Sequence, residues 1–167
     1  MQPDRLCPET AIPSHRAFED LAREEWRRAY EIGAPVALTL VAIDEFEAFR
    51  ARHGAKNSTL CLRQVAGVLA RTLTRGGDVV ARGRTGEFAA VLRDTHLRGA
   101  LYLGNALVEE ISGMYLRLSQ GMAEPLSVSV GVAASVPTDP SSVGSLLNAA
   151  NEALYRARAA GGNRVAS

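Results

Sequence analysis

Four consecutive residues place an arginine and a carboxylate on either side of two glycines, in the order Arg75-Gly76-Gly77-Asp78. The planar fork of an arginine can donate two hydrogen bonds to paired acceptors, such as O6 and N7 of guanine, or to a phosphate. A carboxylate can accept from paired N–H donors on a base edge. Because glycines keep the backbone open, both side chains can face one ligand. The residue types are therefore compatible with a nucleobase site.

The same four residues also fit an ordinary turn. A glycine pair can end a helix by allowing positive φ, an arginine suits the last turn of a helix, and an aspartate can open the strand that follows. The residues alone leave both interpretations open.

Length and composition favour one domain over residues 1–167, with a leader of about 1–15. A hydrophobic share of 47% in 167 residues is enough for one core. The formal charge of +1 gives no global field for nucleic acid or an anionic membrane surface. No run approaches the roughly 20 apolar residues of a membrane span. Cys7 and Cys61 lack His or Cys partners at metal-ligand spacing, which favours a reduced, cytoplasmic setting.

Apolar periodicity and turn residues predict the elements that position the Arg75–Asp78 turn. We expect helices over 16–31, 45–52, 60–73, 97–118 and 141–159, and strands over 35–43, 79–81, 88–92 and 128–133. Trp26 and Tyr30 are expected to face the core from the first helix. The strands 79–81 and 88–92 form a hairpin within residues 78–92. Mixed strands and helices in this order predict an α/β fold with helices flanking a largely antiparallel sheet.

The order of these segments resembles the GGDEF family. Residues 38–46 are similar to its apolar strand ending in Asp-Ile-Asp-x-Phe, and 126–133 to its Ser-x-Gly-x-Ala strand. Residues 146–165 resemble its closing helix and 10–18 a worn copy of its opening motif. Residues 84–88 stand where the family has Gly-Gly-Asp/Glu-Glu-Phe. The resemblance implies a nucleotide-cyclase palm-like, three-layer domain with a central, mostly antiparallel five-stranded sheet.

The family joins two GTP molecules into cyclic di-GMP, and this chemistry needs divalent cations held by oxygen ligands. The resemblance places metal ligands at Ala42 and Glu87, so only one carboxylate remains. Asp44 is interpreted as a cap for the helix that begins near Glu45 rather than as a replacement ligand.

Other positions that the resemblance implies for GTP are altered as well. The guanine contacts fall on Arg50 and Thr59, and the signature turn reads Arg84, Thr85 and Gly86 before the retained glutamate. In the closing segment, the phosphate-contacting lysine of the family corresponds to Arg158, and the arginine of its Gly-Arg-Asn-Arg closing motif corresponds to Gly162. We therefore predict a degenerate domain that is not an enzyme and has no metal or cofactor.

The Arg75–Asp78 turn lies where many family members have an inhibitory site that binds cyclic di-GMP. The resemblance thus predicts a cyclic di-GMP receptor that uses Arg75 and Asp78. A second arginine that the family often supplies is missing near Asn105 and Ala106, so completion of the site by a partner subunit in a homodimer stays open. The alternatives are an interaction or dimerisation module without nucleotide and, third, a residual cyclase or GTP-binding allosteric domain. Nucleic acid and membrane are not expected partners.

Overall fold

A five-stranded sheet forms the centre of the computed structural model, which describes residues 6–73 and 76–167. Its strand order is β2-β3-β1-β6-β7. The strands are β1 (Val36–Ile43), β2 (Val79–Arg82), β3 (Glu87–Arg93), β6 (Val128–Ser135) and β7 (Arg164–Ala166). Neighbouring strands are antiparallel except β6 and β7, which are parallel. The predicted sheet is therefore confirmed.

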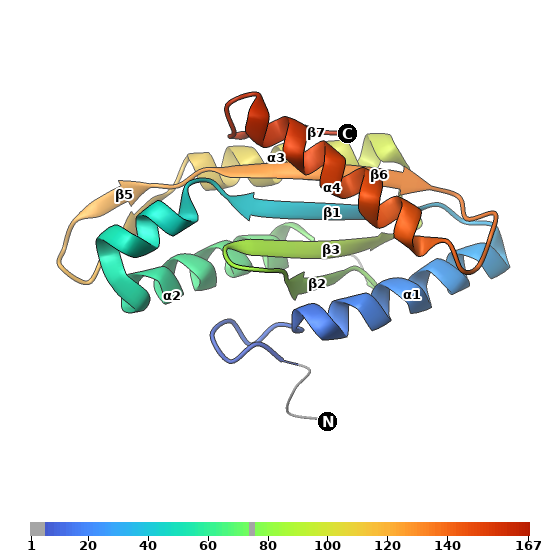
Figure 1. Ribbon diagram of the computed structural model, residues 1–167, viewed down its shortest axis with the longest axis horizontal. Coiled ribbons are helices and arrows are strands. Elements are labelled where there is room, and N and C mark those ends of the chain that lie inside the picture. Colours follow the sequence, from blue (N-terminus) through green and yellow to red (C-terminus); the bar gives the residue numbers. More distant parts are fainter. Residues whose placement is uncertain (1–5, 74–75) are drawn as a thin grey trace.

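Helices cover both faces of this sheet, as Figure 1 shows with α4 in front of the strands and α3 behind them. They are α1 (His15–Ile32), α2 (Phe46–Thr72), α3 (Leu97–Ser112) and α4 (Val143–Ala159). Side chains of β1 alternate between the faces, as in any regular strand. Ala37 and Val41 belong to an apolar cluster with α2 and α3, whereas Val36 and Leu38 belong to a second cluster with α1 and α4.

Helix α1 begins and ends at recognisable capping residues. The side chain of Ser14 accepts a hydrogen bond from the backbone N–H of Ala17, and Gly33 closes the helix with a φ of 63°. Trp26 is buried, as predicted, and its Nε1 donates to the Asp139 carbonyl oxygen at 2.7 Å. The prediction for Tyr30 is wrong, because this side chain is 42% exposed at the margin of the apolar face.

Helix α2 contains both helices predicted between residues 45 and 73. They meet at Gly54, whose φ of 75° and ψ of 179° are not helical and produce a kink. The short segment before the kink lines a cleft that is described below as the candidate site. The longer segment after the kink packs on the sheet. No helix in the described ranges is long and apolar enough to span a membrane.

A small two-stranded ribbon was not predicted. We expected a helix as far as residue 118, but α3 ends at Ser112 and is followed by β4 (Tyr115–Arg117) and β5 (Ala123–Pro125). Gly113 stops the helix, and the chain reverses at Gly121, which has a φ of 82°. The three-residue strands are too short to show a clear alternation of polar and apolar residues in the sequence.

The two cysteines have opposite environments, which leads to a labelling prediction. Cys61 is fully buried in α2, and burial raises the pKa of its thiol to about 12. Burial also opposes ionisation of Cys7, but the neighbouring polar groups of Thr10, the Glu9 backbone and Arg82 favour the thiolate and lower the pKa of this thiol. Because the thiolate is the reactive form, we expect a maleimide to label Cys7 in the native protein well before Cys61. Peptide mass spectrometry checks the order, and equal labelling rates would contradict the described burial.

Candidate functional site

The hairpin turn between β2 and β3 is fixed by backbone hydrogen bonds. Gly83 N–H donates to the Glu87 carbonyl oxygen at 2.8 Å, and Glu87 N–H donates to the Arg84 carbonyl oxygen at 2.9 Å. Gly86 has a φ of 70°, and a Cβ there would lie 2.7 Å from the ring of Phe46. A glycine is therefore required at Gly86, because the turn packs directly on the start of α2.

Glu87 and Ala42, the two positions where the resemblance places metal ligands, lie opposite each other on neighbouring strands. They are paired in the β1–β3 register, and Ala42 is fully buried. The carboxylate of Glu87 is 3.4 Å from a guanidinium nitrogen of Arg158, which comes from the last turn of α4. Glu87 therefore has a cationic partner, and Ala42 adds no oxygen ligand beside it.

Asp44 ties three segments together instead of capping α2. Its carboxylate accepts hydrogen bonds from Ser127 Oγ and Ser129 Oγ, each at 2.6 Å, and from the backbone N–H of Asn163 at 2.9 Å. The cap of α2 is Glu45, which makes no side-chain capping bond. The predicted capping role is wrong because these three donors, all far away in the sequence, occupy the carboxylate.

Gly162 lies beside the Asp44 carboxylate, where a side chain would have little room. A Cβ at Gly162 would lie 3.1 Å from the carboxyl atoms of Asp44, and its φ is 71°. The position of the arginine in the family's closing motif is therefore part of the turn that covers Asp44. Sequence reasoning missed Ser127 and Ser129, although two serines at alternate strand positions were a usable signal.

The carboxylates at this edge do not fit the two-carboxylate metal site that the resemblance implies. Glu87 is paired with Arg158, and Asp44 already accepts three hydrogen bonds. Within residues 6–73 and 76–167, no group of three or more His, Cys, Asp or Glu side chains could hold a metal ion.

A cleft of about 680 Å³ opens beside Asp44, a volume in the usual range for small-molecule sites. Its lining includes Phe46, Thr85, Arg158 and Gly162, so the signature turn meets the closing helix there. The lining also includes Glu47 and Arg52 of the early α2 segment and Glu124 of β5. The structure thus brings together Asp44, Thr85 and Arg158 from three distant segments.

A second hollow of about 350 Å³ lies between the signature turn and α2. Arg50, Ser58, Arg82, Arg84 and Thr85 line it, whereas the other position implied for guanine, Thr59, is not part of the lining. Arg82 was missed in the sequence. Its guanidinium donates to the Glu87 carbonyl oxygen at 2.7 Å and lies 5.0 Å from the ring centre of Phe88.

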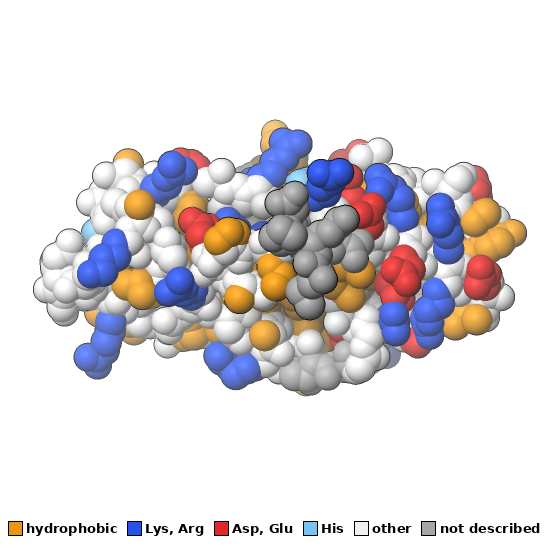
Figure 2. Space-filling view, turned by 90° about the horizontal axis from the view of Figure 1, so that it is seen from below, with side chains coloured by type: hydrophobic (Ala, Val, Ile, Leu, Met, Phe, Trp, Pro, Cys, Tyr) orange, Lys and Arg blue, Asp and Glu red, His pale blue; other side chains and the backbone are white. Residues whose placement is uncertain are grey.

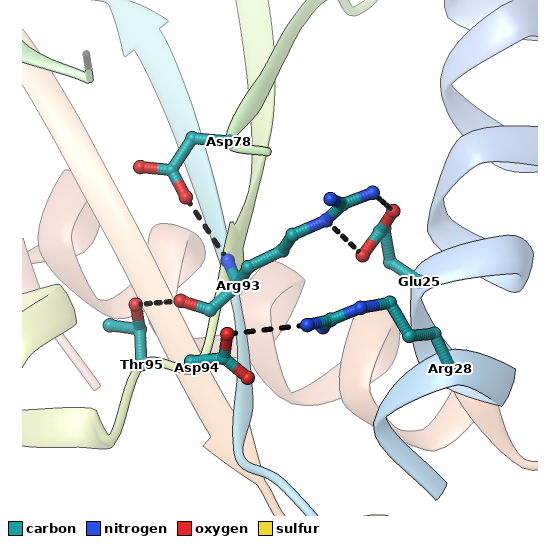
Figure 3. Close-up of polar contacts among 6 residues, drawn as sticks. All are labelled: Glu25, Arg28, Asp78, Arg93, Asp94 and Thr95. Atoms are coloured by element: carbon teal, nitrogen blue, oxygen red, sulfur yellow. Dashed lines mark hydrogen bonds and ion pairs between the residues drawn. The ribbon is translucent and has the colours of Figure 1, made fainter. Parts of the chain in front are cut away.

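The turn before β2 is held against the end of β3, as Figure 3 shows. The backbone N–H of Arg93 donates to Asp78 Oδ1 at 3.1 Å. Gly77 has a φ of 105°, a conformation that favours glycine. Arg75 lies outside the described residues. The Asp78 side chain therefore accepts a hydrogen bond that holds the turn against β3. A role of Arg75 and Asp78 in ligand binding stays a prediction.

Two ion pairs join the end of β3 to α1 (Figure 3). Arg93 Nε donates to Glu25 Oε2 at 2.5 Å, and a second guanidinium nitrogen of Arg93 donates to the other carboxylate oxygen. The hydrogen bond to Glu25 raises the pKa of Arg93 further above its usual range. One turn later on α1, Arg28 lies 3.4 Å from Asp94. Sequence reasoning did not find the first pair, because a glutamate within a helix resembles a solvated residue.

Charges of both signs are interspersed over the face of the molecule seen in Figure 2. Lys and Arg side chains are scattered over this face, and most of the Asp and Glu side chains lie in its right half, with no continuous basic stripe among the coloured atoms. This distribution agrees with the formal charge of +1. It favours local recognition of a small anion over steering of a long polyanion to this face.

Comparisons with known sequences match nearly the whole chain to one family. The family model described as "Diguanylate cyclase, GGDEF domain" matches residues 6–164. "Probable diguanylate cyclase DgcC" of Escherichia coli K12 is 30% identical over 159 residues, which cover 93% of this chain and 41% of that protein. "Diguanylate cyclase DgcP" of Pseudomonas aeruginosa is 27% identical over 158 residues, covering 95% and 23%. The chain spans less than half the length of these relatives.

Solved structures with the same fold include the GGDEF domain of DgcB from Caulobacter crescentus in complex with c-di-GMP. The TM-score is 0.92 at 25% identity, over 99% of this chain and 94% of that one. The GGDEF domain of FimX from Pseudomonas aeruginosa has a TM-score of 0.89 at 21% identity, over 96% and 97%. Both likenesses confirm the predicted fold class.

The relatives contradict the prediction that the domain is not an enzyme, since they are named diguanylate cyclases. That prediction treated Ala42 and the altered signature turn as separate losses of catalytic side chains. It gave too little weight to the framework, which matches the family over residues 6–164. The prediction is therefore wrong.

Proposed function

The chain belongs to the GGDEF family, and we propose that it is a signalling domain that binds cyclic di-GMP. The observation that supports this most strongly is the likeness to the DgcB domain, which was solved in complex with c-di-GMP and matches 99% of this chain. The relatives are longer, so this binding function is proposed for the present domain and not for a whole protein.

We place the ligand at the turn of Arg75 and Asp78. Two features of the turn support this placement. Gly77 adopts a positive φ, and the bond from Arg93 N–H fixes one carboxylate oxygen of Asp78 at the sheet edge. A fixed carboxylate can accept from the N1–H and N2–H₂ groups of guanine without first losing conformational freedom. Arg75 supplies donors for O6, N7 or phosphate.

A calorimetric titration tests the proposal. Cyclic di-GMP should bind in the micromolar range, and GTP at the same concentration should release less heat. Silence from cyclic di-GMP would overturn the proposal. If GTP were silent as well, an interaction or dimerisation module without nucleotide would be the better account.

Cyclic di-GMP synthesis is a second candidate function, which the names of the relatives favour. It leads to a prediction at Ala42, which faces Glu87 across the β1–β3 pair. Ala42→Asp should raise the rate at which GTP is converted to cyclic di-GMP, because it restores a second carboxylate where hard cations bind in the family. Chromatography after incubation with Mg²⁺ or Mn²⁺ measures the product. Ala42→Asn is the size-matched control, and equal rates for the two variants would contradict the prediction.

A further inference from the structure

We propose that Glu25 and Arg93 are positioning residues for the cyclic di-GMP turn, and that through this pair helix α1 sets the ligand affinity of the turn. The inference rests on the proposed function, because it concerns the same turn, residues 76–78. It adds helix α1, which makes no contact with the ligand in the proposed function.

Glu25 is a buried carboxylate on the apolar side of α1. It is 3% exposed and lies beside Trp26, which is equally buried. A carboxylate in such surroundings is costly unless it is paired and hydrogen-bonded. Arg93 provides both through two parallel N–H donors, one of them 2.5 Å from Glu25 Oε2. A bidentate pair of this kind restricts the arginine to one orientation.

Arg93 supports the turn in two ways. Its backbone N–H donates to Asp78 Oδ1 at 3.1 Å. Its side chain lies across Gly77, where a Cβ would be 2.3 Å from Arg93 Cδ and 2.6 Å from a guanidinium nitrogen. The turn is therefore built on the Arg93 side chain, and Glu25 holds that side chain in place. A change in how α1 packs would therefore be passed to the turn through Arg93.

The neighbouring pair of Arg28 and Asp94 has a different character. It joins the same helix to the same end of β3, but the side chains are 37% and 56% exposed. Exposed pairs of this kind contribute little to stability. No contact with the turn is recorded for Arg28 among the described residues, so Arg28 provides a matched control on the same helix.

Coupling between α1 and the turn has a reciprocal consequence. If the packing of α1 against the end of β3 favours ligand binding, then ligand binding must favour this packing by the same factor. Loss of the Glu25 charge should free the Arg93 side chain, and Gly77, which lies against that side chain, should then lose this support and loosen the turn that carries Asp78.

A thermodynamic cycle tests this role with Glu25→Gln, which removes the charge and keeps the shape. We expect its affinity for cyclic di-GMP to be roughly five- to tenfold weaker by calorimetry, and that of Arg28→Ala to be within about twofold of wild type. In an Asp78→Asn background, Glu25→Gln should cause little further loss. Unchanged affinity of Glu25→Gln, or the same loss in both backgrounds, would overturn the inference.

Amide hydrogen exchange gives a second readout that needs no ligand. The Arg93 amide should exchange faster in Glu25→Gln than in wild type or Arg28→Ala, beyond any change in global stability. If wild type failed to bind cyclic di-GMP, the proposed function would fall, while exchange would still decide whether the pair positions the turn. Should Glu25→Gln not fold by circular dichroism, Arg93→Lys keeps the charge without the fork. Exchange at the wild-type rate in the folded variant would refute the positioning role.

Discussion

Arg75→Ala should weaken cyclic di-GMP binding by about ten- to a hundredfold, equivalent to about 1.5–3 kcal/mol. A charge-assisted hydrogen bond to a partly desolvated guanine or phosphate is worth this much, because removal of the donor leaves an acceptor of the ligand unpaired. Arg75→Lys should restore little of the loss, since an ammonium group cannot reproduce the planar fork. Calorimetry or fluorescence titration measures the dissociation constants.

Glu87→Ala is the control for Arg75→Ala. Its carboxylate is 3.4 Å from Arg158, and it takes no part in the proposed ligand turn. We expect this variant to bind cyclic di-GMP about as well as wild type. If Arg75→Ala bound with unchanged affinity while staying folded by circular dichroism, the ligand would lie elsewhere. The arginine-lined hollow at Arg50, Arg82 and Arg84 would be the next place to examine.

Asp78 needs a more careful substitution than Arg75, because the structure gives it a second task. Asp78→Ala would remove the acceptor for Arg93 N–H and could loosen the turn as well as the ligand contact. Asp78→Asn keeps a carbonyl oxygen for that bond while it loses the negative charge that favours guanine N–H donors. It is therefore the variant that separates ligand recognition from support of the turn.

Local patterns made most of the fold predictable. The apolar run of β1, the hairpin of β2 and β3, and the long helix α4 each have a signal contained within their own residues. The ribbon of β4 and β5 was missed because three-residue strands contain too little periodicity. Tyr30 was placed in the core because helical spacing shows the angular position of a residue but not where the neighbouring element ends.

The candidate site was less predictable, because its polar contacts join residues that are far apart in the chain. Asp44 is bonded to Ser127 and Ser129, and Arg93 to Glu25, across separations of 83, 85 and 68 residues. An isolated carboxylate before a helix resembles a cap, and a glutamate within a helix resembles a solvated residue. Only the tertiary fold decides which donor each carboxylate meets.

Gly131→Ala should destabilise the domain by about 3–5 kcal/mol, a larger effect than that of ordinary overpacking, which costs about 1–3 kcal/mol. Gly131 lies in the middle of β6, and α4 packs on its backbone. A Cβ there would lie 2.3 Å from the Leu154 backbone nitrogen and 2.4 Å from the Ala150 carbonyl oxygen. Both atoms belong to the helix backbone, so no rotamer change can relieve the clash and α4 as a whole must move.

Urea unfolding measures this loss, with Gly144→Ala as the matched control. Gly144 lies in the first turn of the same helix, and a Cβ there would meet no atom within 4 Å. Alanine should be neutral or stabilise by about 0.5–1 kcal/mol there, because glycine is the poorer helix former. If Gly131→Ala unfolded at the same urea concentration as wild type, α4 would not sit on β6 as described. A displaced α4 would also shift Arg158 away from Glu87, so this glycine connects the packing of the core to the geometry of the cleft.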